Sequence, residues 1–203
     1  MSQIAAPANQ RLRITLLRAS FICLLPLLVF AAPQSVGQVW FPALQMLGLF
    51  LIIAAVLGRF WSILYIGRHK NHDVIRQGPY SLCRHPLYFF SVLGVTGFGL
   101  LLGSVLLALV LGTLTLGILY ATARREEAYL RRAFGPAYDA YAADTPAILP
   151  NPRLFRTEAE ITVSIRHLRG NLMDALVFLS FIPLAMLIRS LQDQKVVPTF
   201  PIW

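Results

Sequence analysis

Residues 87–120 read LYFFSVLGVTGFGLLLGSVLLALVLGTLTLGILY and decide the fold. A helix needs about 20 apolar residues to cross the hydrocarbon core of a bilayer, so this uncharged run is too long for a single span. Gly103-Ser104 stands near its middle, and both residue types are common in turns. The run therefore predicts two membrane helices joined by a tight hairpin, which would be the third and fourth spans.

The rest of the chain has the same apolar character. Of its 203 residues, 57% are hydrophobic and only 13% are charged, so part of its solvent must be lipid. Further apolar runs cover residues 14–32, 39–66 and 172–188, the last containing Pro183 as an expected kink. We expect an all-α, polytopic integral membrane protein with about five transmembrane helices, forming one domain over residues 1–203.

Lysine and arginine predict the orientation. Four lie in residues 67–85 and eight in residues 123–170, whereas residues 33–38 and the Gly103-Ser104 turn have none. Because short loops rich in these residues stay in the cytosol, both basic segments and the N-terminus are expected inside. The last apolar helix either crosses as a fifth span or lies re-entrant or flat on the membrane.

The charge distribution and the cysteines exclude other classes. The net charge of +9 is divided between apolar runs, as in membrane-surface loops, and forms no stripe for nucleic acid. Cys23 and Cys83 lack the spacing of a metal site or a disulfide framework, so no metal is predicted. Cys83 is either a reactive thiol beside Arg84 or a bystander.

The first cytosolic segment, residues 72–88, reads HDVIRQGPYSLCRHPLY. Gly78-Pro79 marks a turn, and Pro86 suits the first turn of a helix, where the amide that proline lacks would have no partner. Arg84 and His85 immediately precede this helix start, which favours binding of an anionic group such as a carboxylate or a phosphate. Alternatively, the two side chains hold lipid headgroups.

The second cytosolic segment, residues 124–134, reads RREEAYLRRAF and ends at Gly135-Pro136, a strong helix stop. Two adjacent acids at the bilayer surface are costly unless a positive group meets them. Arg84 or a sulfonium cofactor would supply that charge to Glu127; alternatively Glu127 pairs with Arg131, one turn away. The aromatic and proline-rich residues 138–152 either cap a pocket or lie at the interface.

These motifs, in this order and spacing, resemble the isoprenylcysteine carboxyl methyltransferase family and its phospholipid methyltransferase relatives. The resemblance runs from about Arg59 to about Pro150 and rests mainly on R-H-P-x-Y at residues 84–88 and on the pair Glu126-Glu127. Residues 153–190, a charged stretch and an apolar helix, have no place on the family's usual core.

The resemblance implies S-adenosylmethionine held at the cytosolic face. It assigns catalytic roles to Arg84 and to Arg124, the latter preferred to Arg125 as the arginine that meets the substrate. The residues that it assigns to cofactor binding are His72, Asp73, Val74, Ile75, Tyr80, His85, Pro86, Leu87, Tyr88, Glu126 and Glu127.

The expected substrate is lipophilic: an isoprenoid or prenyl carboxylate, or a phospholipid amine. A carboxylate is already ionised and needs no base, whereas an amine must be neutral and would call on Glu127 or a histidine. We favour carboxyl O-methylation in a prokaryotic inner membrane, with membrane lipids as the surroundings. Two rivals remain: a membrane reductase related to sterol reductases that binds a nicotinamide dinucleotide, and a small transporter or scaffold without enzymatic activity.

Overall fold

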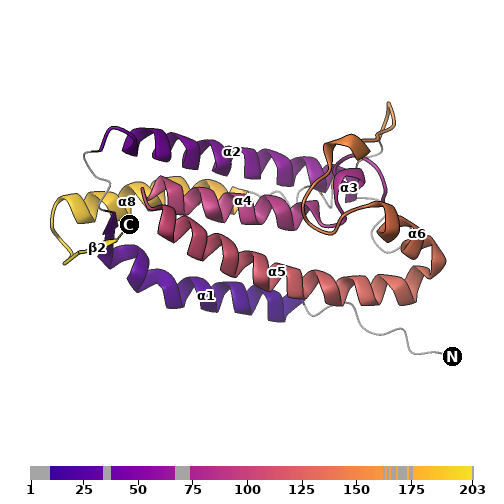
Figure 1. Cartoon of the computed structure of the whole chain (residues 1–203), viewed down its shortest axis with the longest axis horizontal. Helices are drawn as coiled ribbons and strands as arrows, with labels where there is room; N and C mark the ends of the chain where they lie inside the picture. Colours follow the sequence, from indigo (N-terminus) through magenta and orange to yellow (C-terminus); the bar gives the residue numbers. More distant parts are fainter. Residues whose placement is uncertain are drawn as a thin grey trace.

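The computed structural model describes residues 10–33, 38–66, 74–161 and 176–202, together with positions 163, 165, 168 and 173. Within them the protein is an elongated bundle of helices (Figure 1). The long helices are α1 (Gln10–Phe30), α2 (Phe41–Ile66), α4 (Pro86–Leu101), α5 (Val105–Phe134) and α8 (Phe181–Asp193). The shorter helices include α3 (Pro79–Leu82), α6 (Pro136–Asp144), η1 (Pro152–Leu154) and η2 (Val177–Ser180). The expectation of a mostly helical chain is confirmed.

The predicted hairpin between α4 and α5 is present. Gly103 turns the chain with a φ of 87°, and its amide donates to the carbonyl of Leu100. Ser104 then caps α5, because its fully buried hydroxyl accepts from the amide of Leu107. The turn thus satisfies backbone groups that would otherwise lack partners inside an apolar bundle.

Helix α4 lies at the centre of the bundle and packs against α2, α5 and α8. Its approach to α2 depends on glycine: a Cβ on Gly48 would lie 2.4 Å from the Leu101 amide nitrogen and 2.6 Å from the Gly97 carbonyl oxygen. Small residues that allow such close backbone approach are typical of helix contacts in membranes. The buried core away from the basic segments consists of Leu28, Ile52, Phe98, Leu102, Leu107, Leu111, Ala185 and Ile188.

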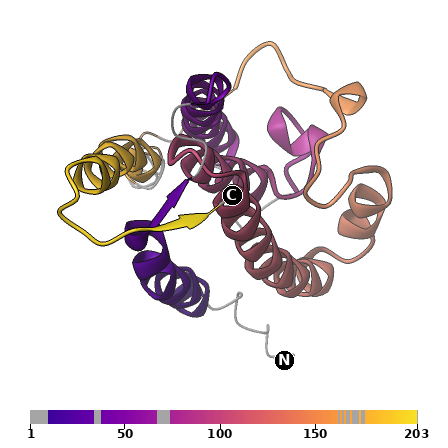
Figure 2. The same ribbon diagram turned by 60° about the vertical axis from the view of Figure 1, so that its left-hand side comes forward.

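The C-terminal part of the chain differs from the expectation in two respects. A short parallel ladder pairs β1 (Ala31–Pro33) with β2 (Phe200–Ile202), so the structure is not purely helical (Figure 2). Pro183 does not kink a continuous helix within the described residues, because it falls in the first turn of α8, directly after η2. An amide in that turn has no helical partner, so proline is tolerated there.

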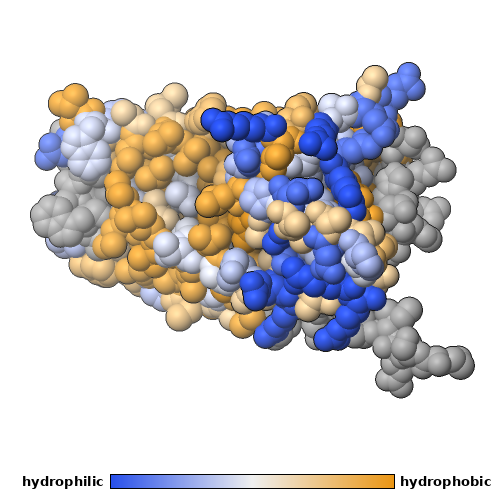
Figure 3. Space-filling view, turned by 45° about the vertical axis from the view of Figure 1, so that its right-hand side comes forward, coloured by the Kyte–Doolittle hydropathy of each residue, from blue (hydrophilic) through white to orange (hydrophobic). Residues whose placement is uncertain are grey.

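Among the described residues, helices α2 and α5 are long and apolar enough to cross a bilayer, and the apolar segments Thr15–Phe30 and Pro86–Leu101 are shorter. At 1.5 Å per residue the 30 residues of α5 extend about 45 Å, more than the hydrocarbon thickness. The charged end of α5, from Arg124 onward, therefore projects beyond the apolar run. Hydrophobic residues cover the side of the bundle, and hydrophilic ones gather toward the end that carries α3 and α6 (Figure 3).

Candidate functional site

The two motif-bearing segments meet at one end of the bundle. There the start of α4 and the projecting end of α5 lie together with α3, α6 and the loop that follows α6 (Figure 1). The α4–α5 hairpin and the β1–β2 ladder lie at the other end. Residues separated by about 40 positions in the sequence thus form a single polar cluster.

Glu127 is at the centre of this cluster. Its side chain is 4% exposed, and its Oε1 lies 2.8 Å from Nη2 of Arg84 and 3.3 Å from Nε2 of His85. Nε of Arg84 donates to the same oxygen at 2.9 Å, so two guanidinium nitrogens bond one carboxylate oxygen. Arg131 adds a longer contact of 3.7 Å to Oε2 from a half-exposed position. Both arginines considered from the sequence therefore contact Glu127, and Arg84 is the nearer.

Arg84 also ties the cluster to the segment after α5. Its Nη1 donates to the carbonyl oxygens of Ala142, at 2.7 Å, and Thr145, at 2.8 Å. The backbone amides of Arg84 and His85 donate to the carbonyls of Pro146 and Ala147, both at 2.9 Å. One guanidinium thus joins α4 to α5 and to the end of α6.

The charges around Glu127 control its ionisation. Burial alone would raise the pKa of this carboxyl group, but the hydrogen bond from His85 and the charge of Arg84 outweigh that effect and lower the pKa from 4.5 to about 2. Glu127 is therefore ionised at neutral pH. A carboxylate of this kind is a fixed negative charge and a very weak base.

His85 and Tyr88 connect the cluster to the membrane part of the bundle. Nδ1 of His85 lies 3.8 Å from Oε2 of Glu126, so the ring lies between the two acids. The rings of His85 and Tyr88 stack, with centroids 5.2 Å apart and an angle of 6° between their planes. Tyr88 in turn packs with Leu119 and Ala123 of α5.

Two buried tyrosines bring unused hydroxyl groups to the same region. The hydroxyls of Tyr80 and Tyr138 have no hydrogen-bond partner within the described part of the chain. Burial raises the pKa of Tyr138 to about 12, with a further contribution from the charge of Glu127, so it stays a neutral donor. Tyr141 differs, since its hydroxyl donates to the carbonyl of Tyr80 at 2.6 Å. Buried polar groups without partners are uncommon and fit a site for a polar ligand.

Residues 138–152, for which the sequence left two roles open, fold over the motifs. Tyr141 donates to the carbonyl of Tyr80, and the carbonyls of Pro146 and Ala147 accept from Arg84 and His85. In addition, the amide of Asn151 donates to the carbonyl of Leu82 at 2.9 Å. These residues act as a cap over α3 and the start of α4. Tyr138, Tyr141 and Thr145 were not among the predicted site residues, although their closeness to the motifs in the family pattern was a usable signal.

The other residues predicted to bind the cofactor are either outside the described part of the chain, half-buried or buried. His72 and Asp73 lie outside the described residues. Val74, Ile75 and Leu87 are half-buried, and Pro86 is buried at the first position of α4.

Arg124, predicted to meet the substrate, is exposed on α5 and makes no hydrogen bond or ion pair with another described residue. Cys83 is 1% exposed, and burial raises the pKa of its thiol to about 12. An uncharged, inaccessible thiol is unreactive, which favours the bystander interpretation.

The part of the chain that carries the motifs is similar to a known protein family. Residues 40–137 match the model of the phospholipid methyltransferase family. The nickel-cobalt-cadmium resistance protein NccN of Alcaligenes xylosoxydans xylosoxydans is 35% identical over 78% of this chain and 74% of its own length. The cobalt-zinc-cadmium resistance protein CzcN of Cupriavidus metallidurans is 37% identical over 83% of this chain and 78% of its own.

Shorter matches reach enzymes whose names state the reaction. Protein-S-isoprenylcysteine O-methyltransferase of Schizosaccharomyces pombe is 30% identical over 45% of this chain and 39% of its own length. No solved structure matches the chain significantly. The chain belongs to the membrane methyltransferase family that includes the phospholipid and isoprenylcysteine methyltransferases, as its motifs had indicated.

Proposed function

We propose that this protein transfers a methyl group from S-adenosylmethionine to the carboxylate of a lipophilic substrate, with its active face on the cytosolic side of a prokaryotic inner membrane. The observation that supports the proposal most directly is the ionised, buried Glu127, held between Arg84 and His85. The hydroxyl of Tyr138, which has no hydrogen-bond partner among the described residues, lies within electrostatic reach of it. Family membership supports the reaction class.

The residues present fit the cofactor. S-adenosylmethionine supplies an activated methyl group on a cationic sulfonium and carries amine, carboxylate and hydroxyl groups. Carboxylates and aromatic faces stabilise such a cation, which makes Glu126, Glu127 and Tyr88 suitable neighbours. The Tyr80 and Tyr138 hydroxyls are free donors for its polar groups within the described cluster. His72, Asp73, Val74 and Ile75 stay proposed contacts on the grounds of the family motif.

The protein's own residues have few chemical tasks in such a reaction. A displacement at a methyl group requires alignment and exclusion of water, and no covalent intermediate. Arg84 acts in the proposal as a positioning residue, because its donors already hold Glu127 and the cap formed by residues 138–152. Arg124, exposed on α5, is left to attract the acidic end of the substrate.

The low pKa of Glu127 favours a carboxylate acceptor over an amine. An amine must lose a proton before it can attack, and an effective general base has a pKa near the operating pH. Glu127, with a pKa of about 2, is far from that range. A carboxylate acceptor needs no such base.

The test combines binding with turnover. Calorimetry on the detergent-purified protein should detect micromolar binding of S-adenosylhomocysteine and none of NADPH. Radiolabelled S-adenosylmethionine should then label a prenyl-thioether carboxylate, and the label should be released by mild base, as expected for a methyl ester. Phosphatidylethanolamine is the matched amine acceptor and should stay unlabelled.

Each contrary outcome has a clear meaning. Binding of NADPH alone would support the reductase rival, and binding of neither ligand to folded protein would support a transporter or scaffold. Base-stable label in the phospholipid would overturn the choice of a carboxylate acceptor.

The names of NccN and CzcN add a physiological setting to the proposal. Because this chain is 35–37% identical to them over about four fifths of its length, we infer that it contributes to bacterial resistance to cobalt and cadmium. In a resistant strain deleted for CzcN, the chain should restore growth on cobalt, and a Glu127→Gln variant should not. Equal restoration of growth by the wild-type chain and by Glu127→Gln would show that resistance does not depend on methyl transfer.

A further inference from the structure

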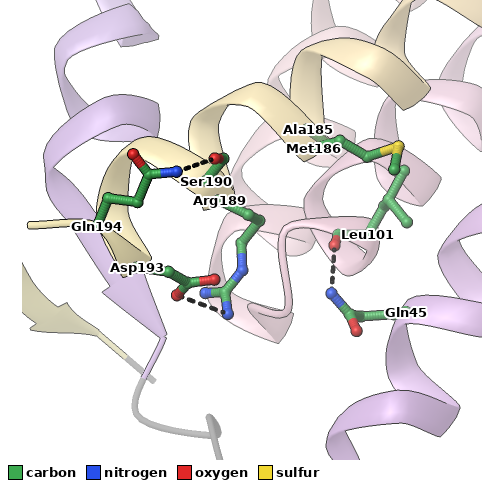
Figure 4. Close-up of a pocket in the computed structure, with 8 residues that line it drawn as sticks. All are labelled: Gln45, Leu101, Ala185, Met186, Arg189, Ser190, Asp193 and Gln194. Atoms are coloured by element: carbon green, nitrogen blue, oxygen red, sulfur yellow. Dashed lines mark hydrogen bonds and ion pairs between the residues drawn. The ribbon is translucent and has the colours of Figure 1, made fainter. Parts of the chain in front are cut away.

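A pocket lies at the end of the bundle opposite the candidate site. It has a volume of about 370 Å³ and lies between the start of α2, the end of α4 and α8 (Figure 4). Volumes of this size are typical of small-ligand pockets. Its lining residues are Gln45, Leu101, Ala185, Met186, Arg189, Ser190, Asp193 and Gln194.

Arg189 is the principal charged group of this pocket. Its side chain is 13% exposed, and its guanidinium carbon lies 5.1 Å from the centre of the Phe41 ring. Asp193, the only acid among the lining residues, is 62% exposed and lies 3.5 Å from Nη2 of Arg189 (Figure 4). An ion pair with one exposed partner and a single 3.5 Å contact contributes little and leaves most of the five guanidinium donors available. The ring of Phe41 fixes the guanidinium without using those donors.

The rest of the lining is divided into an apolar and a polar part. Met186 is 67% exposed and lies with Leu101 and Ala185 on one side, whereas the amides and hydroxyl of the other residues form the polar part. The Gln45 amide donates to the Leu101 carbonyl over a long 3.4 Å, so another acceptor can replace that partner at little cost. A pocket with an arginine beside exposed apolar surface matches an amphiphile that has an anionic head.

The position along the bundle agrees with a lipid. The α4–α5 hairpin turn and the N-terminal end of α2 lie at this end, and Trp40, which precedes α2, is 51% exposed. Tryptophan is enriched where a membrane protein meets the headgroup region. The pocket therefore lies at headgroup depth, in the leaflet opposite the candidate site.

We propose that this pocket binds the phosphate of an anionic phospholipid, with Arg189 and Gln45 on the headgroup and Leu101 and Met186 against the first acyl carbons. Asp193 competes with the phosphate for Arg189 in the empty pocket and swings into solvent when lipid binds. This site is independent of the proposed methyl transfer.

The experiment is native mass spectrometry of the full chain with phosphatidylglycerol, and with phosphatidylcholine as the zwitterionic reference. Wild type should retain phosphatidylglycerol preferentially. Arg189→Gln should lower that retention at least fivefold, and Arg189→Lys should restore part of it. Asp193→Asn should raise it, because the competing carboxylate is gone. Lys195→Gln removes an exposed charge just after α8, outside the pocket lining, and should have no effect.

Two outcomes would overturn the proposal. The first is a failure of the lipid preference: wild type retains both lipids equally, or the Arg189→Gln and Asp193→Asn variants retain phosphatidylglycerol as wild type does. Circular dichroism checks that both variants are folded. The second is full displacement of phosphatidylglycerol by millimolar inorganic phosphate, which would show that the pocket holds a free anion instead of a lipid. Because the Asp193 side chain is exposed, Asp193→Asn should leave the fold intact, so the test does not depend on Arg189 alone.

Discussion

Replacing Glu127 by glutamine should weaken binding of S-adenosylhomocysteine at least tenfold, or about 1.4 kcal/mol, and reduce methyl transfer to background. The carboxylate is buried, ionised and held by two cationic or polar partners. The substitution removes this fixed negative charge, which in the proposed site lies near the ammonium group that S-adenosylhomocysteine shares with S-adenosylmethionine. Titration calorimetry and a single-turnover assay with radiolabelled cofactor measure the two effects separately.

Glu126→Gln is the matched control. Glu126 is the same residue type one position earlier, but its side chain is 29% exposed and its contact to His85 is longer, 3.8 Å. The Glu126→Gln substitution should weaken the binding free energy of S-adenosylhomocysteine by less than half of the change caused by Glu127→Gln. If the two variants behave alike, or if Glu127→Gln binds S-adenosylhomocysteine like wild type, the role assigned to Glu127 is wrong.

The same residue makes a pH-dependent contribution to stability. Because folding lowers the pKa of Glu127 from 4.5 to about 2, its contribution is complete above about pH 4.5 and is lost as the pH falls toward 2. The shift corresponds to about 3 kcal/mol. Unfolding curves in detergent between pH 5 and 3 should therefore show a steeper loss of stability for wild type than for Glu127→Gln.

Local signals predicted most of the helix boundaries. Pro86 begins α4, Gly103-Ser104 forms the hairpin, and Gly135, with a φ of 55°, ends α5 as expected. Each of these positions depends on the geometry of a single residue type, which the sequence displays directly. The β1–β2 ladder could not be predicted in the same way, because it joins residues about 170 positions apart through backbone atoms that carry no side-chain signal.

In the candidate site too, the sequence indicated interactions between side chains but not those that end on backbone atoms. The high cost of an unpaired acid at the membrane surface left Arg84, a sulfonium cofactor or Arg131 as the partner of Glu127, and the structure contains the ion pair with Arg84. The two further bonds of Arg84 end on the backbone carbonyls of Ala142 and Thr145, which any residue type could supply. The sequence therefore included this charge pair among its alternatives, but gave no sign that Arg84 also holds the cap of residues 138–152.

Replacing Arg84 by alanine should lower the free energy of unfolding by about 3 to 5 kcal/mol, because it leaves a buried carboxylate without its main counterion. The carbonyls of Ala142 and Thr145 also lose their donor. Thermal unfolding in detergent, followed by circular dichroism, measures the effect. Arg132→Ala, an exposed arginine on α5, is the control and should change the free energy by less than about 0.5 kcal/mol.

Arg84→Lys separates charge from geometry. Lysine keeps the positive charge near Glu127, but all three of its donors are on one nitrogen and cannot reproduce the spread of the guanidinium donors toward the carboxylate and the two carbonyls. If Arg84 is a positioning residue, the lysine variant should retain S-adenosylhomocysteine binding within about threefold while the cap of residues 138–152 exchanges amide hydrogens faster. If instead hydrogen exchange is unchanged and only turnover falls, Arg84 touches the reacting groups directly. Faster exchange at the amides of Tyr141 to Ala147 is therefore the result that distinguishes a clamp from a catalytic group.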